Sequence, residues 1–161
     1  MADALVVAVT QIGVSEKPLN SNWGPDVELY LRSVGINFPA SWCAAFVYWC
    51  YQQASIKAGF ENPLIKTGGC LDHWNRSAKL AKRFSAADVA KNPALIRPGQ
   101  IFIMDFGGGA GHTGFVVAID GKYIITIEGN TNIDGSRNGV GVFKRRRPIA
   151  SINKGFIDYS L

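Results

Sequence analysis

Cys43 is the residue with the clearest capacity for chemistry, because it lies where an apolar helix is expected to begin. The stretch 41–50 is largely apolar, and Ser41 is a residue type that commonly caps the N-terminus of a helix. Unpaired N–H groups and a partial positive charge at a helix start favour a thiolate over a thiol. Free cysteines are also frequent in hydrophobic cores. Cys43 therefore indicates either a nucleophile that needs a base or a small buried side chain.

A base and two polar partners for such a nucleophile follow in the second half of the chain. His112 comes directly after a glycine-rich segment, and Glu128 and Asn130 lie near the end of the next predicted strand. An imidazole can take the proton of a thiol, and a carboxylate or amide can orient the imidazole. Each residue alone has an ordinary explanation as a polar side chain at the end of a strand. The order cysteine, histidine, acid or amide favours a cysteine hydrolase.

The hairpin that joins His112 to Glu128 can be aligned in two ways. A two-residue turn at 120–121 would place the two side chains on opposite faces of the sheet. A three-residue loop at 119–121, with glycine in its left-handed position, places them directly opposite each other. It also collects apolar side chains on one face of the hairpin, namely Phe115, Val117, Tyr123, Ile125 and Ile127. We therefore predict the three-residue loop.

The elements that must position these residues change in type along the chain. Apolar residues at helical spacing predict helices in the first part, at residues 3–12, 26–34, 43–58, 71–83 and 86–91. Short β-rich segments separated by glycine predict strands afterwards, at residues 100–106, 112–119, 122–129, 140–147 and 155–159. Helices followed by strands indicate an α+β fold with N-terminal helices packed on an antiparallel sheet. Because no repeat or low-complexity linker interrupts the pattern, we expect a single domain over residues 1–161.

Composition and charge exclude several classes of protein. An apolar content of 47% and a charged content of 18% over 161 residues exclude a disordered or fibrous chain. No apolar run approaches the roughly 20 residues of a membrane span, so we expect no membrane span. The first residues lack the basic region of a secretory signal, so we expect synthesis in the cytoplasm without a signal peptide.

The net charge of +5 favours association with polyanions such as bacterial wall polymers. The basic run at 144–147 is explained either by a binding patch or by a solvated sheet edge. Aromatic residues do not alternate with these basic residues, which argues against a nucleic-acid partner.

The three cysteines are an odd number, so at least one thiol stays free in any pairing. Cys43 and Cys50 are seven residues apart on the same predicted helix and cannot bridge, and we place Cys50 in the core. Cys70 and His73 are two metal-ligand types, but no second pair completes a zinc site. We therefore predict no metal and no cofactor.

Four short motifs together resemble a CHAP domain (cysteine, histidine-dependent amidohydrolase/peptidase), which is related to the papain-like NlpC/P60 group. They are Trp42-Cys43-Ala44-Ala45-Phe46, Arg97-Pro98-Gly99, Gly111-His112-Thr113-Gly114 and Ile127-Glu128-Gly129-Asn130, and the resemblance extends to residues 11–13 and 20–22. The resemblance implies a papain-like α+β fold that hydrolyses peptide or amide bonds of peptidoglycan. It further implies that Cys43 is the nucleophile, His112 the base, Glu128 the third member and Asn130 an additional polar partner.

Two departures from the pattern of the family concern local structure and metal binding. Gln100 stands where many members have an acidic residue, and no acidic loop suggests the calcium site that some members have. We also expect that tryptophans line a groove for glycan or peptide, although core packing is the commoner role for any single one of them. The three are Trp23, Trp42 and Trp74.

Several functions remain open at this point. The chain is expected to degrade the cell wall either as a phage-type lysin released through a holin or as an antibacterial toxin effector with a cognate immunity protein. Both would act in the periplasm or outside the cell after non-classical export. The alternatives are an amidase or peptidase for a small soluble amide, a non-catalytic wall-binding module, and a cytosolic regulatory protease. Glycan amidases and peptide endopeptidases share this catalytic set, so the bond that is cut is also open.

Overall fold

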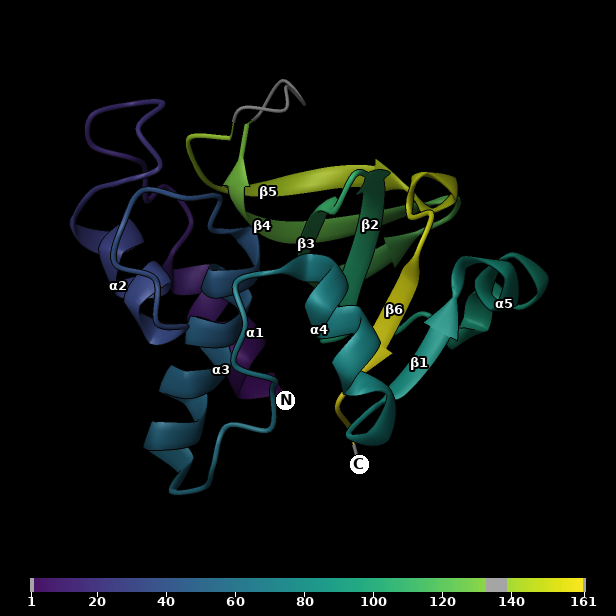
Figure 1. The fold of residues 1–161 in the computed structure, drawn as a ribbon. Helices are drawn as coiled ribbons and strands as arrows, with labels where there is room; N and C mark the ends of the chain where they lie inside the picture. Colours follow the sequence, from purple (N-terminus) through teal and green to yellow (C-terminus); the bar gives the residue numbers. More distant parts are fainter. Residues whose placement is uncertain (1, 133–138, 161) are drawn as a thin grey trace.

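The computed structural model describes residues 2–132 and 139–160, in which helices of the first half pack on a six-stranded antiparallel sheet (Figure 1). This arrangement confirms the predicted α+β fold. The α-helices are α1 (Ala2–Thr10), α2 (Pro25–Ser33), α3 (Cys43–Ala58), α4 (Cys70–Arg76) and α5 (Ala86–Lys91), with short 3₁₀ helices η1 (Ser77–Lys79), η2 (Pro93–Leu95) and η3 (Ile149–Ser151). The strands are β1 (Lys82–Ser85), β2 (Ile101–Gly107), β3 (Ala110–Asp120), β4 (Tyr123–Thr131), β5 (Gly141–Pro148) and β6 (Gly155–Asp158).

The sheet has the order β1-β6-β2-β3-β4-β5 and separates two hydrophobic cores. On one face, α1, α2 and α3 bury the side chains of alternate strand residues such as Phe115 and Ile127. On the other face, Val116 and Ile124 pack with residues of α5 and with Ile152. Because successive side chains of a strand point to opposite faces, both cores draw on the same strands.

The predicted helix at 71–83 is wrong in its second half. Helix α4 ends at Arg76, and the chain forms strand β1, in which Phe84 pairs with Phe156 of β6. Ser85 then caps α5, since its side chain accepts a hydrogen bond from the N–H of Asp88 and the Asp88 carboxylate accepts one from the N–H of Ser85. Apolar spacing did not reveal β1, because a four-residue edge strand is defined by its partner β6 rather than by its own sequence.

The hairpin of β3 and β4 adopts neither of the two predicted registers. A two-residue turn at 121–122 pairs Asp120 with Tyr123, and an irregularity between Val116 and Ala118 shifts the pairing by one residue. Phe115 then lies opposite Ile127 on the face covered by the helices. The predicted three-residue loop is wrong because the extra residue lies within β3, as a β-bulge, and not in the turn.

The glycine-rich segment before His112 completes a hairpin. Strands β2 and β3 are joined by a tight turn at 108–109, and Met104 pairs with His112. His112 is therefore an interior residue of a paired strand, which fixes the direction of its side chain.

Strand β5 lies at one edge of the sheet, and its two halves are protected in different ways. Backbone hydrogen bonds join its start to the chain between Gly13 and Glu16. The second half contains the basic run 144–147, whose residues alternate between the two faces of the strand. Charged side chains on an edge strand hinder pairing with other chains. No helix among residues 2–132 and 139–160 is long and apolar enough to cross a membrane.

Candidate active site

Cys43 is the first residue of α3, and Trp42 is the N-cap residue. Ser41 is exposed and makes no capping bond, so its predicted capping role is wrong. With its side-chain oxygen facing the helix, Asn130 instead accepts a hydrogen bond from the N–H of Trp42 at 3.2 Å. Asn130 has a φ of 53°, a conformation that asparagine tolerates better than most residues. The end of β4 therefore holds the start of the helix that bears Cys43.

His112 and Glu128 form the central contact of the site. The Nε2 atom of His112 lies 2.7 Å from Oε2 of Glu128, and both side chains are buried. They meet diagonally across the hairpin, because the register of the flanking pairs places Gly114 opposite Glu128. A Cβ atom at Gly114 would approach Cγ of Glu128 to 2.8 Å. The absence of a side chain at this position therefore leaves room for the diagonal contact.

Glu128 is kept ionised by groups on β4 and β5. The guanidinium of Arg147 donates two hydrogen bonds to the carboxylate, at 2.6 and 2.7 Å, and the hydroxyl of Thr126 donates a third at 2.6 Å. Burial alone would raise the pKa of Glu128, but hydrogen bonds and charges from Arg147 and His112 outweigh it and lower the pKa to about 2. A charged carboxylate thus faces the imidazole over the whole neutral range.

Cys43 and His112 form a coupled pair of acid and base. Burial alone would lower the pKa of His112, but its contacts with Cys43 and Glu128 raise the pKa to about 9. The pKa of Cys43 lies well below its usual value, first because of a hydrogen bond from Cys70 and then because of His112 and the N–H of Ala44, with burial acting in the opposite direction. Since Nε2 of His112 bonds to Glu128, Nδ1 is the ring nitrogen left for the thiol. These shifts favour a thiolate and an imidazolium at neutral pH.

The profile of the CHAP domain matches residues 35–130, which is more than half of the chain. The chain belongs to the CHAP family. Neither the search of curated proteins nor the search of solved structures gives a match. The matched segment contains Cys43, His112, Glu128 and Asn130, and it makes this protein a member of a family of cysteine-dependent amidohydrolases and peptidases. Residues 11–13 and 20–22, which we had included in the resemblance, lie outside the match.

Two contacts of the CHAP site were not predicted from the sequence. The first is between Sγ of Cys70 and Sγ of Cys43, which are 3.5 Å apart, and the second is between Arg147 and Glu128. Arg147 lies beyond the segment that the family profile matches. Arg147 was included in the basic run but had no assigned partner. The alternation of side chains along β5 could have placed it on the face of Glu128, had the pairing of β5 with β4 been known.

Cys70 and His73, the two metal-ligand types noted in the sequence, contact different partners. The ring of His73 is hydrogen-bonded through Nε2 to the hydroxyl of Tyr159 at 2.8 Å, whereas the thiol of Cys70 faces Cys43. Among the residues that the structure describes, no group of three histidine, cysteine, aspartate or glutamate side chains could hold a metal ion.

Gln100 is a neutral side chain that bonds within the protein. Its amide nitrogen donates to the carbonyl of Leu95 and to the carboxylate of Asp158, and its oxygen accepts from the N–H of Arg97. Gln100 is buried and lies at the start of β2. These hydrogen bonds fix the loop before β2.

The three tryptophans considered for substrate binding differ in exposure. Trp42 is fully buried and its indole N–H donates to Glu16, so its assignment to a groove is wrong: the ring packs between Tyr30 and Phe46. Trp23 and Trp74 are partly exposed, and the guanidinium of Arg83 lies 4.9 Å from the ring of Trp74. A role for these two in substrate binding stays a prediction.

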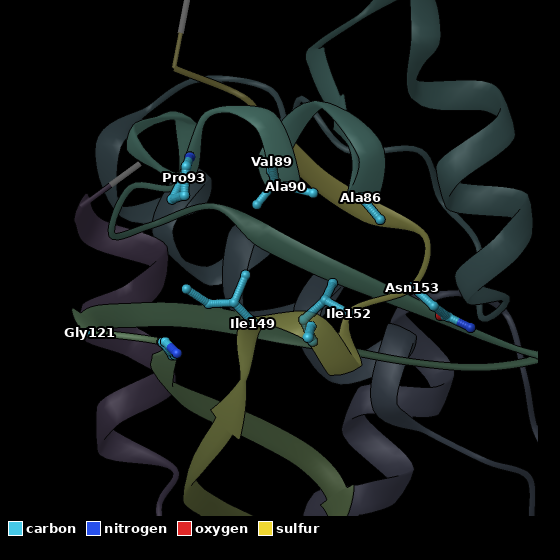
Figure 2. Close-up of a pocket in the computed structure, with 10 residues that line it drawn as sticks. Ala86, Val89, Ala90, Pro93, Gly121, Ile149, Ile152 and Asn153 are labelled. Atoms are coloured by element: carbon cyan, nitrogen blue, oxygen red, sulfur yellow. The ribbon is translucent and has the colours of Figure 1, made fainter.

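An apolar hollow of about 500 Å³ lies away from the site around Cys43 (Figure 2). Val89 and Ala90 of α5 line one side of it, and Ile149 and Ile152 line the other. None of the residues that line it belongs to the site around Cys43.

Proposed function

We propose that this CHAP domain is a peptidoglycan hydrolase that cleaves wall peptide or amide bonds through a thioester on Cys43. The observation that supports this proposal is the continuous chain of contacts from Cys43 through His112 and Glu128 to Arg147. It gives the thiol a base and gives the base a fixed, charged partner. A wall-binding module would need neither.

In the proposed first step, the sulfur of Cys43 attacks the carbonyl carbon of the scissile bond. The oxygen of that carbonyl gains negative charge and is stabilised by N–H groups at the start of α3, which lack partners within the helix. The N–H of Cys43 belongs to this set, and one such donor contributes about 3 kcal/mol in other enzymes. Asn130 supports the same helix start through Trp42. We therefore assign Asn130 a positioning role.

In the proposed second step, His112 gives its proton to the departing amine, and a thioester remains on Cys43. Neutral His112 then takes a proton from water, which attacks the thioester and releases the acid product. Glu128 keeps the imidazole in one orientation and stabilises its charged form in both steps. Its ion pair with Arg147 keeps the carboxylate from taking the proton itself.

The substrate locates the proposed action at the bacterial cell wall. A net charge of +5 supports approach to anionic wall polymers, because opposite charges steer association. A phage-type lysin and an injected effector with an immunity partner fit this proposal equally, and both reach the wall from the cytoplasm where the chain is made.

The substitution Cys43→Ala tests the proposal, with Cys50→Ala as the matched control. Cys50 lies on the same helix and is fully buried, and burial raises the pKa of its thiol. We expect wild type and Cys50→Ala to release soluble fragments from purified peptidoglycan, and Cys43→Ala to release none above background. Mass spectrometry of the fragments identifies the bond. Fragment release by Cys43→Ala would contradict the mechanism, and hydrolysis of small amides without any release from peptidoglycan would contradict the substrate.

A further inference from the structure

The proposed mechanism uses only one of two adjacent thiols. Sγ of Cys43 and Sγ of Cys70 are 3.5 Å apart, and both residues are buried, with exposed fractions of 4% and 7%. Cys70 begins α4, which packs against α3, β2 and β3. A second thiol within contact distance of a nucleophilic sulfur has its own chemistry, which hydrolysis does not require.

We propose that Cys43 and Cys70 form a reversible disulfide when the protein meets a two-electron oxidant such as hydrogen peroxide, and that this bond switches the nucleophile off. The site is thus also a modification site. The bond itself does not depend on the proposed catalytic function, whereas the loss of activity rests on it.

The geometry requires only a small movement. A disulfide has a sulfur–sulfur distance of about 2.05 Å, so the two atoms must approach by roughly 1.5 Å. Rotation about the Cα–Cβ bonds of the two side chains changes this distance without unfolding a helix. The packing of α4 on α3 keeps the two thiols together in the folded protein. Cys50, in contrast, is fully enclosed by the core.

The chemistry balances with peroxide as the oxidant. The thiolate of Cys43 attacks one peroxide oxygen, an S–O bond forms, the O–O bond breaks, and the departing hydroxide takes the proton held by His112 to become water. Cys70 then attacks the sulfur of the sulfenic acid, an S–S bond forms and the S–O bond breaks. The second hydroxide leaves as water with the proton of Cys70. Two thiols are oxidised, and one peroxide is reduced to two waters.

The charges of the site support this order of events. The pKa of Cys43 is lowered, so its thiolate is the first to react with peroxide. The pKa of Cys70 is raised well above its usual value, first by its hydrogen bond to Cys43, then by burial and by the charge of Cys43. Oxidation of Cys43 to a neutral sulfenic acid removes the last of these causes, the negative charge of Cys43. The pKa of Cys70 should therefore fall after this oxidation, which makes its sulfur a better nucleophile for the attack on the sulfenic acid.

The experiment uses peroxide in slight excess over the full-length protein, followed by mass spectrometry under non-reducing conditions. In Cys50→Ala, trypsin leaves Cys43 in peptide 33–57 and Cys70 in peptide 67–76. We expect these peptides to be linked after oxidation and separate after dithiothreitol. In wild type, chymotrypsin cleaves between Cys43 and Cys50 at Phe46, Tyr48 and Trp49, so the same link is detectable without any substitution.

The activity of the same samples and a second variant complete the test. Peroxide should abolish release of peptidoglycan fragments by wild type, and dithiothreitol should restore it. In Cys70→Ser, Cys43 should instead gain oxygen atoms, and dithiothreitol should restore a smaller fraction of the starting activity. Oxygen atoms on Cys43 of wild type without any linked peptide would overturn the proposal. A linked peptide in a protein that never cleaves peptidoglycan would leave the disulfide standing and overturn the proposed function.

Discussion

The chain has two histidines, His73 and His112, and the structure places them in similar surroundings with opposite outcomes. Both are buried, with exposed fractions of 3% and 8%, and each has its Nε2 atom hydrogen-bonded to an oxygen, at 2.8 and 2.7 Å. Burial lowers the pKa of His73 to about 4, whereas the contacts of His112 raise its pKa to about 9. At neutral pH one ring is therefore neutral and the other is charged.

The difference lies in the charge of the partner and not in burial. His73 faces the hydroxyl of Tyr159, which stays protonated because burial raises its pKa. His112 faces the carboxylate of Glu128, which stays ionised because Arg147 pairs with it. A buried imidazole becomes a cation only where a chain of opposite charges compensates its desolvation. In this fold the charged groups contact His112, next to Cys43, whereas the hydrogen-bond partner of His73 is neutral.

The largest change in this comparison should come from Glu128→Gln, which gives His112 a neutral partner like that of His73. We expect kcat/KM on peptidoglycan to fall by at least about 100-fold, because the imidazole loses the charge that stabilises its protonated form. The alkaline limit of activity, set in wild type by loss of the His112 proton near pH 9, should move to lower pH. A pH profile of the rate measures both.

Glu128→Asp serves as the control, because it keeps the charge but shortens the side chain. Its alkaline limit should stay closer to that of wild type even if its rate is reduced. An unchanged alkaline limit in Glu128→Gln would show that Glu128 does not set the charge of His112.

A smaller effect is expected from Arg147→Met, which leaves Glu128 with His112 as its remaining charged partner. The variant should lose on the order of 3 kcal/mol of unfolding free energy, since it breaks a largely buried ion pair. If loss of Arg147 lets Glu128 take up a proton and the pKa of His112 falls by one unit from about 9, kcat/KM above pH 9 should fall about tenfold. Urea unfolding and the pH profile measure these changes. Arg147→Lys keeps the charge but not the paired hydrogen bonds, so its unfolding free energy should lie between those of wild type and Arg147→Met. Equal stability of all three proteins would contradict the role of Arg147.

The smallest effect on activity is expected from His73→Gln. We expect kcat/KM to change by less than about twofold, because His73 shares no hydrogen-bond partner with His112. Unfolding should respond instead: the folded protein binds a proton at His73 only near pH 4, whereas the unfolded chain binds one near pH 6.5. Wild type should therefore lose stability as the pH falls from 6.5 towards 4, and the variant should lose less.

Proton NMR of the two imidazoles checks the comparison directly. His73→Gln should retain one imidazole signal that titrates near pH 9, and the signal it lacks should titrate near pH 4 in wild type. Titration of both rings near the usual value would contradict the comparison.

The sequence predicted the contact of His112 with Glu128, but the hairpin register from which we argued was wrong. The three-residue loop and the observed two-residue turn with a bulge both place the two residues on one face. In a strand, parity decides the face, so one inserted residue has the same effect wherever it falls. The pairing that we expected to be direct is diagonal, because the turn at 121–122 lies later in the chain than the predicted loop at 119–121, so that Gly114 and not His112 lies opposite Glu128.

The helix of Cys43 was predicted over its full length, 43–58, because its apolar residues and Gly59 are local signals. The partners of Cys43 beyond the motif were harder to predict. Arg147 reaches Glu128 only because β5 pairs with β4, and Cys70 reaches Cys43 only because α4 packs on α3. Such contacts between distant segments depend on the tertiary fold and leave no periodic signal in the sequence. The same reason explains why Asn130, and not the adjacent Ser41, caps the helix start.

The close packing at Gly129 predicts how the protein should lose its activity on heating. A Cβ atom at this position would lie 2.7 Å from Cγ of Phe46 and 2.8 Å from Cζ3 of Trp42, so the backbone of β4 rests directly on the first turn of α3. Cys43 and Glu128 thus lie on two elements, α3 and β4, that cannot separate without opening the hydrophobic core between the helices and the sheet. Loss of activity and global unfolding should then share one temperature, with no inactive but folded intermediate between them.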